Sequence, residues 1–180
     1  MKKIIKTYGV LALVVGVVLI LDQVTKALVR ANLPFGASWS PFSGFLSFIR
    51  IVHWQNTGAA FGMFQGGGVV FGVLAMIVSL FIILYFPKIP QEFLVMRIAL
   101  AMQMGGALGN LIDRIQFGPV TDFIAVGAFP VFNIADASIT VGVAILLLFM
   151  WLQERKEKAA GQETEPTQQD FNEKTSDGLS

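Results

Sequence analysis

Carboxylates are the side chains through which this sequence is best able to do chemistry. The chain of 180 residues has twelve acidic residues, and seven of them lie after Gln153, in a polar tail. Among the other five, Asp122 and Asp136 are only fourteen residues apart, so the link between them can return to the same level of the fold. We therefore expect these two carboxyl groups to meet.

Two carboxyl groups in contact predict a specific chemistry. They cannot both ionise cheaply, so one keeps its proton near neutral pH. The ionised group can take a proton from a water molecule that attacks a peptide carbonyl, while the protonated group polarises that carbonyl. The pattern therefore predicts an aspartic peptidase site. A helix starting near Asp136 favours Asp136 as the ionised member, within a pair that titrates as a unit.

Asp136 also has a structural interpretation, which remains open at this point. Asn133 can cap the helix that follows, and Asp136, three residues later, would complete a start that resembles a capping box. This interpretation accounts for Asp136 but not for Asp122.

Asp22 and Lys26 form a second group of interest, because residues four apart share a helix face. They can be an ion pair in which Lys26 extends toward the membrane surface. They can also be an orienting or charge-balancing pair beside a reaction centre. The sequence supports both interpretations.

Two further motifs place polar groups beside small residues. Asn56 precedes Gly58 in the stretch Asn56–Phe61, which is either a turn or a wall that receives an extended peptide. Gly105 and Gly109 have the spacing of close helix packing. They precede three polar residues on nearly one helix face, namely Asn110, Asp113 and Arg114.

The second of these motifs also has two interpretations. In one, the glycines only pack and Arg114 reaches lipid headgroups. In the other, Asn110 is buried and requires a hydrogen-bond partner, which a neighbouring carboxylate would supply.

Other chemistries are disfavoured by composition. The sequence has no cysteine and a single histidine, His53, which argues against disulfides, thiolate sites, cysteine nucleophiles and a metal site of the His-rich kind. A net charge of +1, without a basic patch that carries aromatic residues, gives no indication of nucleic-acid binding.

We expect membrane helices to hold these residues in place. Hydrophobic residues make up 54% of the chain and charged residues only 14%, well below the level of soluble domains. Four segments are long and apolar enough to cross a bilayer, at about 7–28, 68–86, 93–112 and 134–152. The first lacks a signal-peptidase cleavage pattern, so we expect a retained helix. The predicted class is an all-α polytopic membrane protein.

Orientation follows from the basic residues. Four spans place all of the following on one side, which is then the cytoplasm, with both termini: Lys2, Lys3, Lys6, Lys88, Arg155, Lys156 and Lys158. Residues 29–67 are too polar to span, and Leu46–Trp54 predicts one or two strands of a small β platform outside the membrane. We expect a membrane domain over 1–157 and a disordered cytoplasmic tail over 158–180.

The depth of the acidic residues supports a functional site. Asp22 lies sixteen residues after Lys6, or about 24 Å along a helix, close to the outer boundary. Asp113 ends the third span, Asp122 follows it in the outer loop, and Asp136 opens the fourth span, so all three belong to the same membrane face. Ionisable groups at membrane depth are costly, so their convergence indicates function.

These motifs, in this order, resemble lipoprotein signal peptidase (signal peptidase II) over about residues 6–152. The resemblance rests on Asp22-Gln23 with Lys26, Asn56 to Phe61, Gly105 to Arg114, Val120 to Phe123, and Phe132-Asn133 with Ala135-Asp136. It implies four helices, a small outer β-cradle and no cofactor. It also implies Asp122 and Asp136 as catalytic dyad, with a supporting shell of Asp22, Lys26, Asn56, Gly58, Asn110, Asp113, Arg114 and Asn133.

The resemblance further implies a substrate and a location. The substrate would be a prolipoprotein bearing a diacylglyceryl-modified cysteine, cut just before that cysteine in a bacterial (inner) cell membrane. Globomycin-like cyclic peptides would inhibit, and we expect a monomer in contact with membrane lipid. Residues 123–132 resemble a lid, and Phe123, Phe129 and Phe132 would either contact acyl chains or anchor the interface.

Three other functions compete with this one. An ion-coupled transporter would also bury carboxylates, although such sites lie near the midplane, often between repeated halves, and no repeat is visible. A serine–lysine peptidase could use Lys26 with Ser43 or Ser47, although these serines lie in a strand-like segment. A non-catalytic assembly factor for lipoproteins should tolerate loss of both dyad carboxylates.

Overall fold

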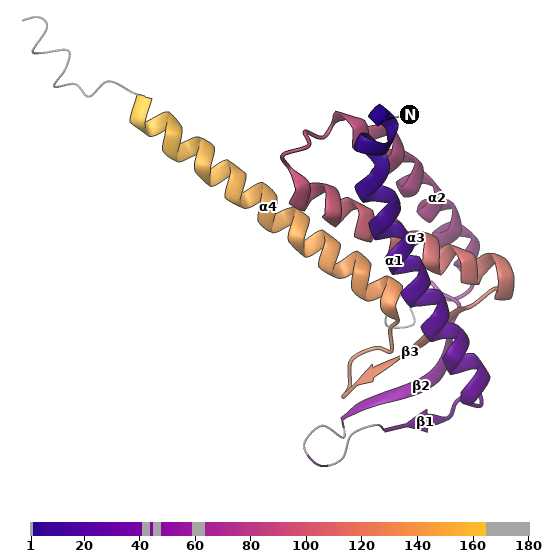
Figure 1. The fold of residues 1–180 in the computed structure, drawn as a ribbon. Coiled ribbons are helices and arrows are strands. Elements are labelled where there is room, and N and C mark those ends of the chain that lie inside the picture. The colour runs from indigo at the N-terminus through magenta and orange to yellow at the C-terminus, as the bar shows by residue number, and fades with distance from the viewer. Residues whose placement is uncertain (1, 41–43, 45–47, 59–63, 165–180) are drawn as a thin grey trace, which may run out of the picture. The chain divides into compact units, whose positions relative to one another are not determined.

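The computed structural model describes residues 2–40, 44, 48–58 and 64–164 of the chain. Its helices are α1 (Lys2–Asn32), α2 (Gly68–Tyr85), the short 3-10 helix η3 (Phe86–Lys88), α3 (Leu94–Phe117) and α4 (Ile134–Thr164). Its strands are β1 (Ser38–Trp39), β2 (Ile49–Asn56) and β3 (Val120–Val126). Figure 1 shows the strands gathered at the ends of α1 and α3.

The four long helices confirm the predicted polytopic class. Within the described residues, four helices are long and apolar enough to cross a membrane, over Thr7–Asn32, Gly68–Lys88, Leu94–Phe117 and Ile134–Lys158. Their outward apolar side chains are exposed, as the 68% exposure of Leu13 and the 63% exposure of Phe81 illustrate. Such surfaces suit lipid rather than water.

Three of the four long helices continue past the ends that the sequence predicted. Helix α1 continues to Asn32 and α3 to Phe117, each about one turn past its expected end. Helix α4 includes residues 158–164, which are therefore helical rather than part of a disordered tail. Residues 165–180 lie outside the described residues, so the expectation of disorder there remains a prediction.

The chain divides into two compact units, residues 1–146 and 147–180. The first contains α1 to β3 and the beginning of α4, and it holds all of the predicted site residues. The second contains the rest of α4, where Arg155 stacks over Trp151 at 4.4 Å and Lys158 pairs with Glu154 at 2.6 Å.

The sheet has three antiparallel strands in the order β1-β2-β3. The β platform expected within residues 29–67 is thus present, but this segment supplies only two of its strands. The third strand comes from residues 120–126. We expected these residues, Asp122 included, in a loop. The register between β2 and β3 shifts between Ile51 and Trp54, and Trp54 lies opposite Asp122. Asp122 is therefore held on a paired strand.

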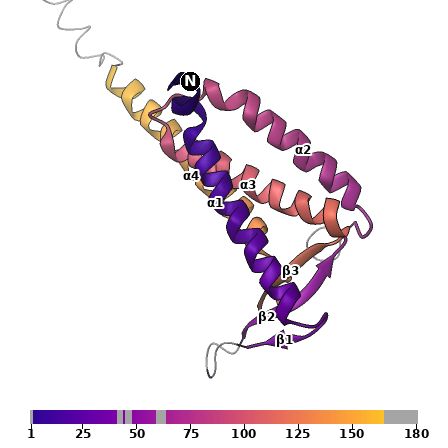
Figure 2. The same cartoon turned by 45° about the vertical axis from the view of Figure 1, so that its right-hand side comes forward.

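Helix α3 packs against both α1 and α2 (Figures 1 and 2). As predicted, Gly105 and Gly109 permit close approach to α1. A Cβ atom at Gly105 would lie 2.8 Å from Val18 Cβ, and one at Gly109 would lie 2.6 Å from Asp22 Oδ2. Gly106 does the same toward α4, because its Cβ would lie 2.3 Å from the carbonyl oxygen of Ala135.

A buried arginine links the N-terminal parts of α1 and α3. Arg97 donates from Nη1 to the carbonyl of Ile89 at 3.0 Å and from Nη2 to the carbonyl of Thr7. Its guanidinium also stacks over Phe86, 4.3 Å from the ring centroid. This residue therefore ties the start of α1 to the turn between η3 and α3.

Candidate active site

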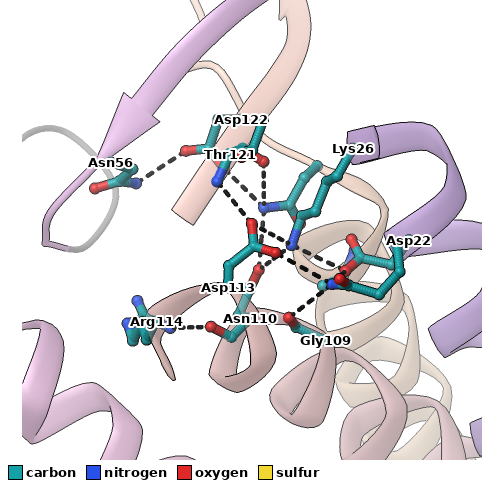
Figure 3. A network of polar contacts seen from close by, with 12 residues as sticks. Asp22, Lys26, Asn56, Gly109, Asn110, Asp113, Arg114, Thr121 and Asp122 are labelled. Atoms are coloured by element: carbon teal, nitrogen blue, oxygen red, sulfur yellow. Dashed lines mark hydrogen bonds and ion pairs between the residues drawn. The ribbon is translucent and has the colours of Figure 1, made fainter. Parts of the chain in front are cut away.

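The predicted site residues converge where the ends of α1 and α3 and the start of α4 meet strand β3. Figure 3 shows the resulting polar network at close range. Among its members, Asp22, Lys26, Asp113 and Asn133 are completely buried, and Asp122 is 1% exposed. Buried polar groups are stable only when they are hydrogen bonded, so the partners of each group decide what the site can do.

Asp122 is held by two asparagine amides. Its Oδ2 accepts a hydrogen bond from Nδ2 of Asn56 at 3.0 Å, and its Oδ1 accepts one from Nδ2 of Asn133 at 2.7 Å. The Asn56 carbonyl oxygen in turn accepts a hydrogen bond from the backbone N–H of Gly58 at 3.0 Å. The Asn56 motif therefore both turns the chain and orients Asp122.

Asp136 lies in the first turn of α4 and is bonded on both oxygens. Its Oδ1 accepts from Nδ2 of Asn110 at 2.7 Å, which is the carboxylate partner predicted for that buried amide. Its Oδ2 accepts from the backbone N–H of Asn133 at 3.2 Å, and Asn133 Oδ1 accepts from the backbone N–H of Asp136 at 2.9 Å. The reciprocal capping arrangement is therefore present.

Asn133 joins the two carboxylates into one cluster. Its side-chain amide donates to Asp122, and its backbone N–H donates to Asp136. The same amide also donates to Oδ1 of Asn110 at 3.1 Å. The structure thus brings Asp122 and Asp136 to the two sides of one asparagine, and both line the same cavity.

The electrostatic environment favours the protonated form of Asp122. Burial, and after it the negative charge of nearby Asp136, raise the pKa of Asp122 from its ordinary value to about 7. Hydrogen bonds from Asn56 and Asn133 act in the opposite direction, because they stabilise the ionised form. At neutral pH the pair can therefore hold one proton beside one negative charge.

Lys26 lies in a buried ion cluster behind the dyad. Its Nζ is 2.9 Å from Asp22 Oδ2 and 3.4 Å from Asp113 Oδ2, and it donates to Asn110 Oδ1 at 2.9 Å. The side chain is 0% exposed, so the interpretation in which Lys26 extends to the membrane surface is wrong. Its engagement also disfavours the serine–lysine site, whose Ser43 and Ser47 lie outside the described residues.

The two carboxylates of this cluster position the backbone next to each dyad residue. Asp113 Oδ2 accepts from the N–H of Thr121, directly before Asp122, at 2.9 Å. Asp22 Oδ1 accepts from the N–H of Ala135, directly before Asp136, at 3.0 Å. A hydrogen bond to a charged group is stronger than a neutral one. Helices α1 and α3 therefore set the positions of both catalytic candidates.

Arg114 and Gly58 form one wall of the cavity. Arg114 Nη1 donates to the carbonyl of Asn110 at 3.3 Å, and Nη2 donates to the carbonyl of Gly58 at 3.4 Å. The guanidinium lies 5.5 Å from the centroid of the Phe71 ring. Within the described residues, Arg114 Nε is buried and has no hydrogen-bond partner. Arg114 thus faces the site rather than reaching for headgroups.

Sequence reasoning left two positioning residues out of the shell. Gln23 Nε2 lies within hydrogen-bond distance of Asp22 Oδ2, the carbonyl of Gly109 and Asp113 Oδ1, at 3.1, 3.1 and 3.2 Å. Arg30 donates to Thr121 Oγ1 at 2.9 Å and stacks over Phe117 at 4.4 Å. Arg30 was detectable, because it follows Lys26 by four residues on one helix face.

The dyad opens into a cavity of about 720 Å³. Phe71, Leu74 and Val78 of α2 give it an apolar side, and Phe129 and Phe132 also line it. Phe123 does not, and it is buried in the interior instead. The cavity therefore offers a polar end with two carboxylates and an apolar extension along the helices.

The segment predicted to be a lid begins as part of the sheet. Residues up to Val126 belong to β3, and Phe132 pairs back with Ile124 through hydrogen bonds of 2.8 and 3.1 Å. Its motion remains a prediction. Within the described ranges, no three residues of the types His, Cys, Asp and Glu are grouped so as to hold a metal ion.

Known proteins resemble this chain over most of its length. The profile of a family described as signal peptidase (SPase) II matches residues 14–152. The lipoprotein signal peptidase of a Dehalococcoides mccartyi strain is 48% identical over 136 residues, which are 71% of this chain and 79% of the relative. That of Halothermothrix orenii is 38% identical over 143 residues, which are 79% of this chain and 96% of the relative.

A solved structure resembles the fold as well. It is described as a bacterial membrane enzyme at 2.3 Å resolution, and it matches with a TM-score of 0.74 at 37% sequence identity. The match covers 83% of this chain and 92% of that one. The similarity of the two folds thus extends over most of both chains.

Proposed function

This chain belongs to the signal peptidase II family, and on that premise we propose that it is an aspartic endopeptidase that removes signal peptides from prolipoproteins within a membrane. Its substrate carries a diacylglyceryl-modified cysteine, and the bond cut is the one directly before that cysteine. Asp122 and Asp136 are the catalytic pair in this proposal.

One observation carries the aspartic mechanism. Asp122 and Asp136 are bonded to opposite sides of Asn133 and face one cavity, while burial and the charge of Asp136 raise the pKa of Asp122 to about 7. A pair of this kind is able to share a single proton at neutral pH.

The reaction follows from this protonation state. Asp136, in the first turn of α4 and bonded by Asn110, remains ionised and takes a proton from the attacking water. Protonated Asp122 donates to the oxygen of the scissile carbonyl, so that charge on the oxygen is neutralised as the water oxygen bonds to carbon. The tetrahedral intermediate then loses its C–N bond, and the leaving amine takes a proton from the dyad.

The cavity suits a substrate that is anchored in lipid. Its polar end contains the dyad, and its apolar extension is lined by Phe71 and Leu74 of the second span. An acylated precursor lies in the bilayer with its cleavage site at the surface, so a dyad at that depth acts without extracting the lipid. Phe129 is 60% exposed and lines the cavity, where it can contact acyl chains.

Cleavage of a purified precursor, with and without its diacylglyceryl group, tests the proposal. We expect wild-type protein to cut the lipidated form efficiently, and we expect Asp122→Asn and Asp136→Asn each to reduce kcat by at least about 10³-fold. Glu92→Gln, which removes an exposed carboxylate near the other end of α3, should keep wild-type activity.

Two results would contradict the proposal and favour another function. Wild-type processing by both Asp→Asn variants would indicate an assembly factor. Ion flux in liposomes that survives loss of both carboxylates would indicate a transporter. Globomycin-like cyclic peptides should inhibit cleavage by the wild-type protein in the same assay, since we expect them to occupy the dyad.

A further inference from the structure

A polar side chain lies deep in the apolar part of the cavity, away from the dyad. Gln103 of α3 lines the cavity together with Ala107, Asn110 and Arg114, which follow it at intervals of three or four residues. These residues form one stripe along the helix. Gln103 lies about two helical turns before Asn110, and Val78 and Leu74 of α2 line the same cavity.

The amide of Gln103 has hydrogen-bonding capacity that the described residues do not use. Its Nε2 is buried, and none of the residues that the structure describes offers it a hydrogen-bond partner. Its Cγ lies against α4, where a Cβ atom added at Gly142 would be 3.0 Å away. An unsatisfied buried donor destabilises a fold, so a polar residue at this position is expected to bond a ligand.

The depth of Gln103 identifies which part of the substrate it can reach. Asn110, which bonds Asp136, marks the level of the dyad. Seven residues of helix separate it from Gln103, a rise of about 10 Å. A peptide that is extended for cleavage advances about 3.3 Å per residue, so about three residues cover that distance.

We propose that Gln103 Nε2 donates a hydrogen bond to a main-chain carbonyl of the signal peptide, about three residues before the cleaved bond. This inference rests on the proposed function, because it requires a peptide substrate that enters from the membrane. An extended backbone inside the bilayer leaves its carbonyls without intrachain partners, which costs several kcal/mol for each group. Gln103 supplies one such partner at the required depth.

The ester carbonyls of the diacylglyceryl group are a poorer match. They are attached to the cysteine that follows the cleaved bond, and they therefore lie near the level of the dyad. Below them the acyl chains contain no hydrogen-bond acceptor. The main chain of the signal peptide is the part of the substrate that continues from the dyad toward the level of Gln103 with a carbonyl on every residue.

Steady-state cleavage of the lipidated precursor by Gln103→Met protein tests the proposal, since methionine keeps the length of the side chain and lacks the amide. We expect a five- to tenfold lower kcat/KM, the loss typical of one neutral hydrogen bond. The effect should lie mainly in KM, because the contact is distant from the reacting atoms. The melting temperature should stay equal or rise, because an unsatisfied donor has been removed.

Substrates with one backbone ester locate the contact. An ester in place of the amide bond after the second, third or fourth residue before the cleavage point gives a weaker carbonyl acceptor. With one of these ester substrates, the kcat/KM of wild-type protein should be several-fold lower than with the all-amide substrate. The kcat/KM of Gln103→Met protein should be the same for both substrates. Ser79→Ala is the matched control, because Ser79 Oγ is also buried without a partner in the described chain but does not line the cavity.

The outcomes separate this inference from the proposed function. If Gln103→Met protein cuts every substrate like the wild type, the inference is wrong while the dyad mechanism stands. The same holds if the melting temperature of Gln103→Met protein is lower than that of the wild type and the ester substrates reduce its kcat/KM as much as they reduce that of the wild type. If wild-type protein fails to cut the lipidated precursor at all, both are wrong.

Discussion

At the scale of single residues, the site depends on asparagines that link charged groups to one another. Asn133 donates to both dyad carboxylates, and Asn110 accepts from Lys26 while it donates to Asp136. An amide is both a donor and an acceptor, and it stays neutral at any pH used for assays. These two residues therefore connect the buried ion cluster to the dyad without adding charge.

The raised pKa of Asp122 predicts a pH dependence of activity. Above about pH 7 the dyad loses its shared proton, so kcat/KM should fall about tenfold per pH unit. Asn56 stabilises ionised Asp122, so Asn56→Ala should raise the pKa of Asp122 and move this descending limb to higher pH. Asn32→Ala, which removes an amide that donates to the carbonyl of Leu28 in its own helix, should leave the limb in place. A shift to lower pH would contradict the assignment.

The buried lysine predicts a large effect on stability. In Lys26→Met protein, Asp22 and Asp113 would remain buried without the cation between them. Breaking a buried pair in this way typically costs about 3–5 kcal/mol of the free energy of unfolding. Lys158→Met breaks a pair whose side chains are 73% and 61% exposed, so it should change stability by less than about 1 kcal/mol. Thermal unfolding in detergent compares the two, and equal effects would argue against a structural role of the cluster.

At the scale of elements, helix α3 is the part on which the others are assembled. One of its faces contacts α1 through Gly105 and Gly109, and another contacts α4 through Gly106. Glycine is needed at these positions because a Cβ atom would meet the neighbouring helix at less than 3 Å. The close approach is what allows Asp22 on α1 to reach the first turn of α4 past α3.

Substitution of these glycines should therefore destabilise the protein. A Cβ atom at Gly106 would lie 2.3 Å from the backbone oxygen of Ala135, which cannot move without shifting α4. Gly106→Ala should cost about 1–3 kcal/mol and reduce cleavage, because Asp136 follows Ala135 directly. Gly16→Ala in α1 meets nothing within 4 Å and should be neutral or slightly stabilising. Equal melting temperatures for the two variants would show that α4 can move away without cost.

At the scale of the whole molecule, the membrane decides what the site can meet. The four apolar helices support a multi-pass protein, and the distribution of basic residues leads us to propose that both termini are cytoplasmic in the bacterial inner membrane. The dyad and the sheet would then face the outside, where a translocated precursor presents its modified cysteine.

Single cysteines test this orientation cleanly, because the sequence contains none. Ser38 in β1 and Lys88 in η3 are both exposed and lie at opposite ends of the spans. In intact spheroplasts, a membrane-impermeant maleimide should label Ser38→Cys at once and should label Lys88→Cys only after lysis. Labelling in the reverse order would place the site on the cytoplasmic side.

The helices and the acidic residues of the site could be predicted from the sequence. Composition and apolar runs are local properties that lipid enforces, so four spans could be predicted within about one turn of most of their ends. Asp22, Asp113, Asp122 and Asp136 stood out because charge at membrane depth is costly and therefore rarely accidental. The capping geometry of Asn133 and Asp136 was also predictable, since it involves residues three apart.

The pairing of these groups, by contrast, depends on how distant segments of the chain pack together. Strand β3 was missed because its stability comes from pairing with β2, which lies more than sixty residues earlier in the chain. The burial of Lys26 depended on Asp113 of α3, and sequence spacing alone favoured neither of its two interpretations. Gln103 gave no signal within an apolar helix until the neighbouring spans enclosed it. Contacts between distant segments depend on packing and burial, and neither is a local property of the chain.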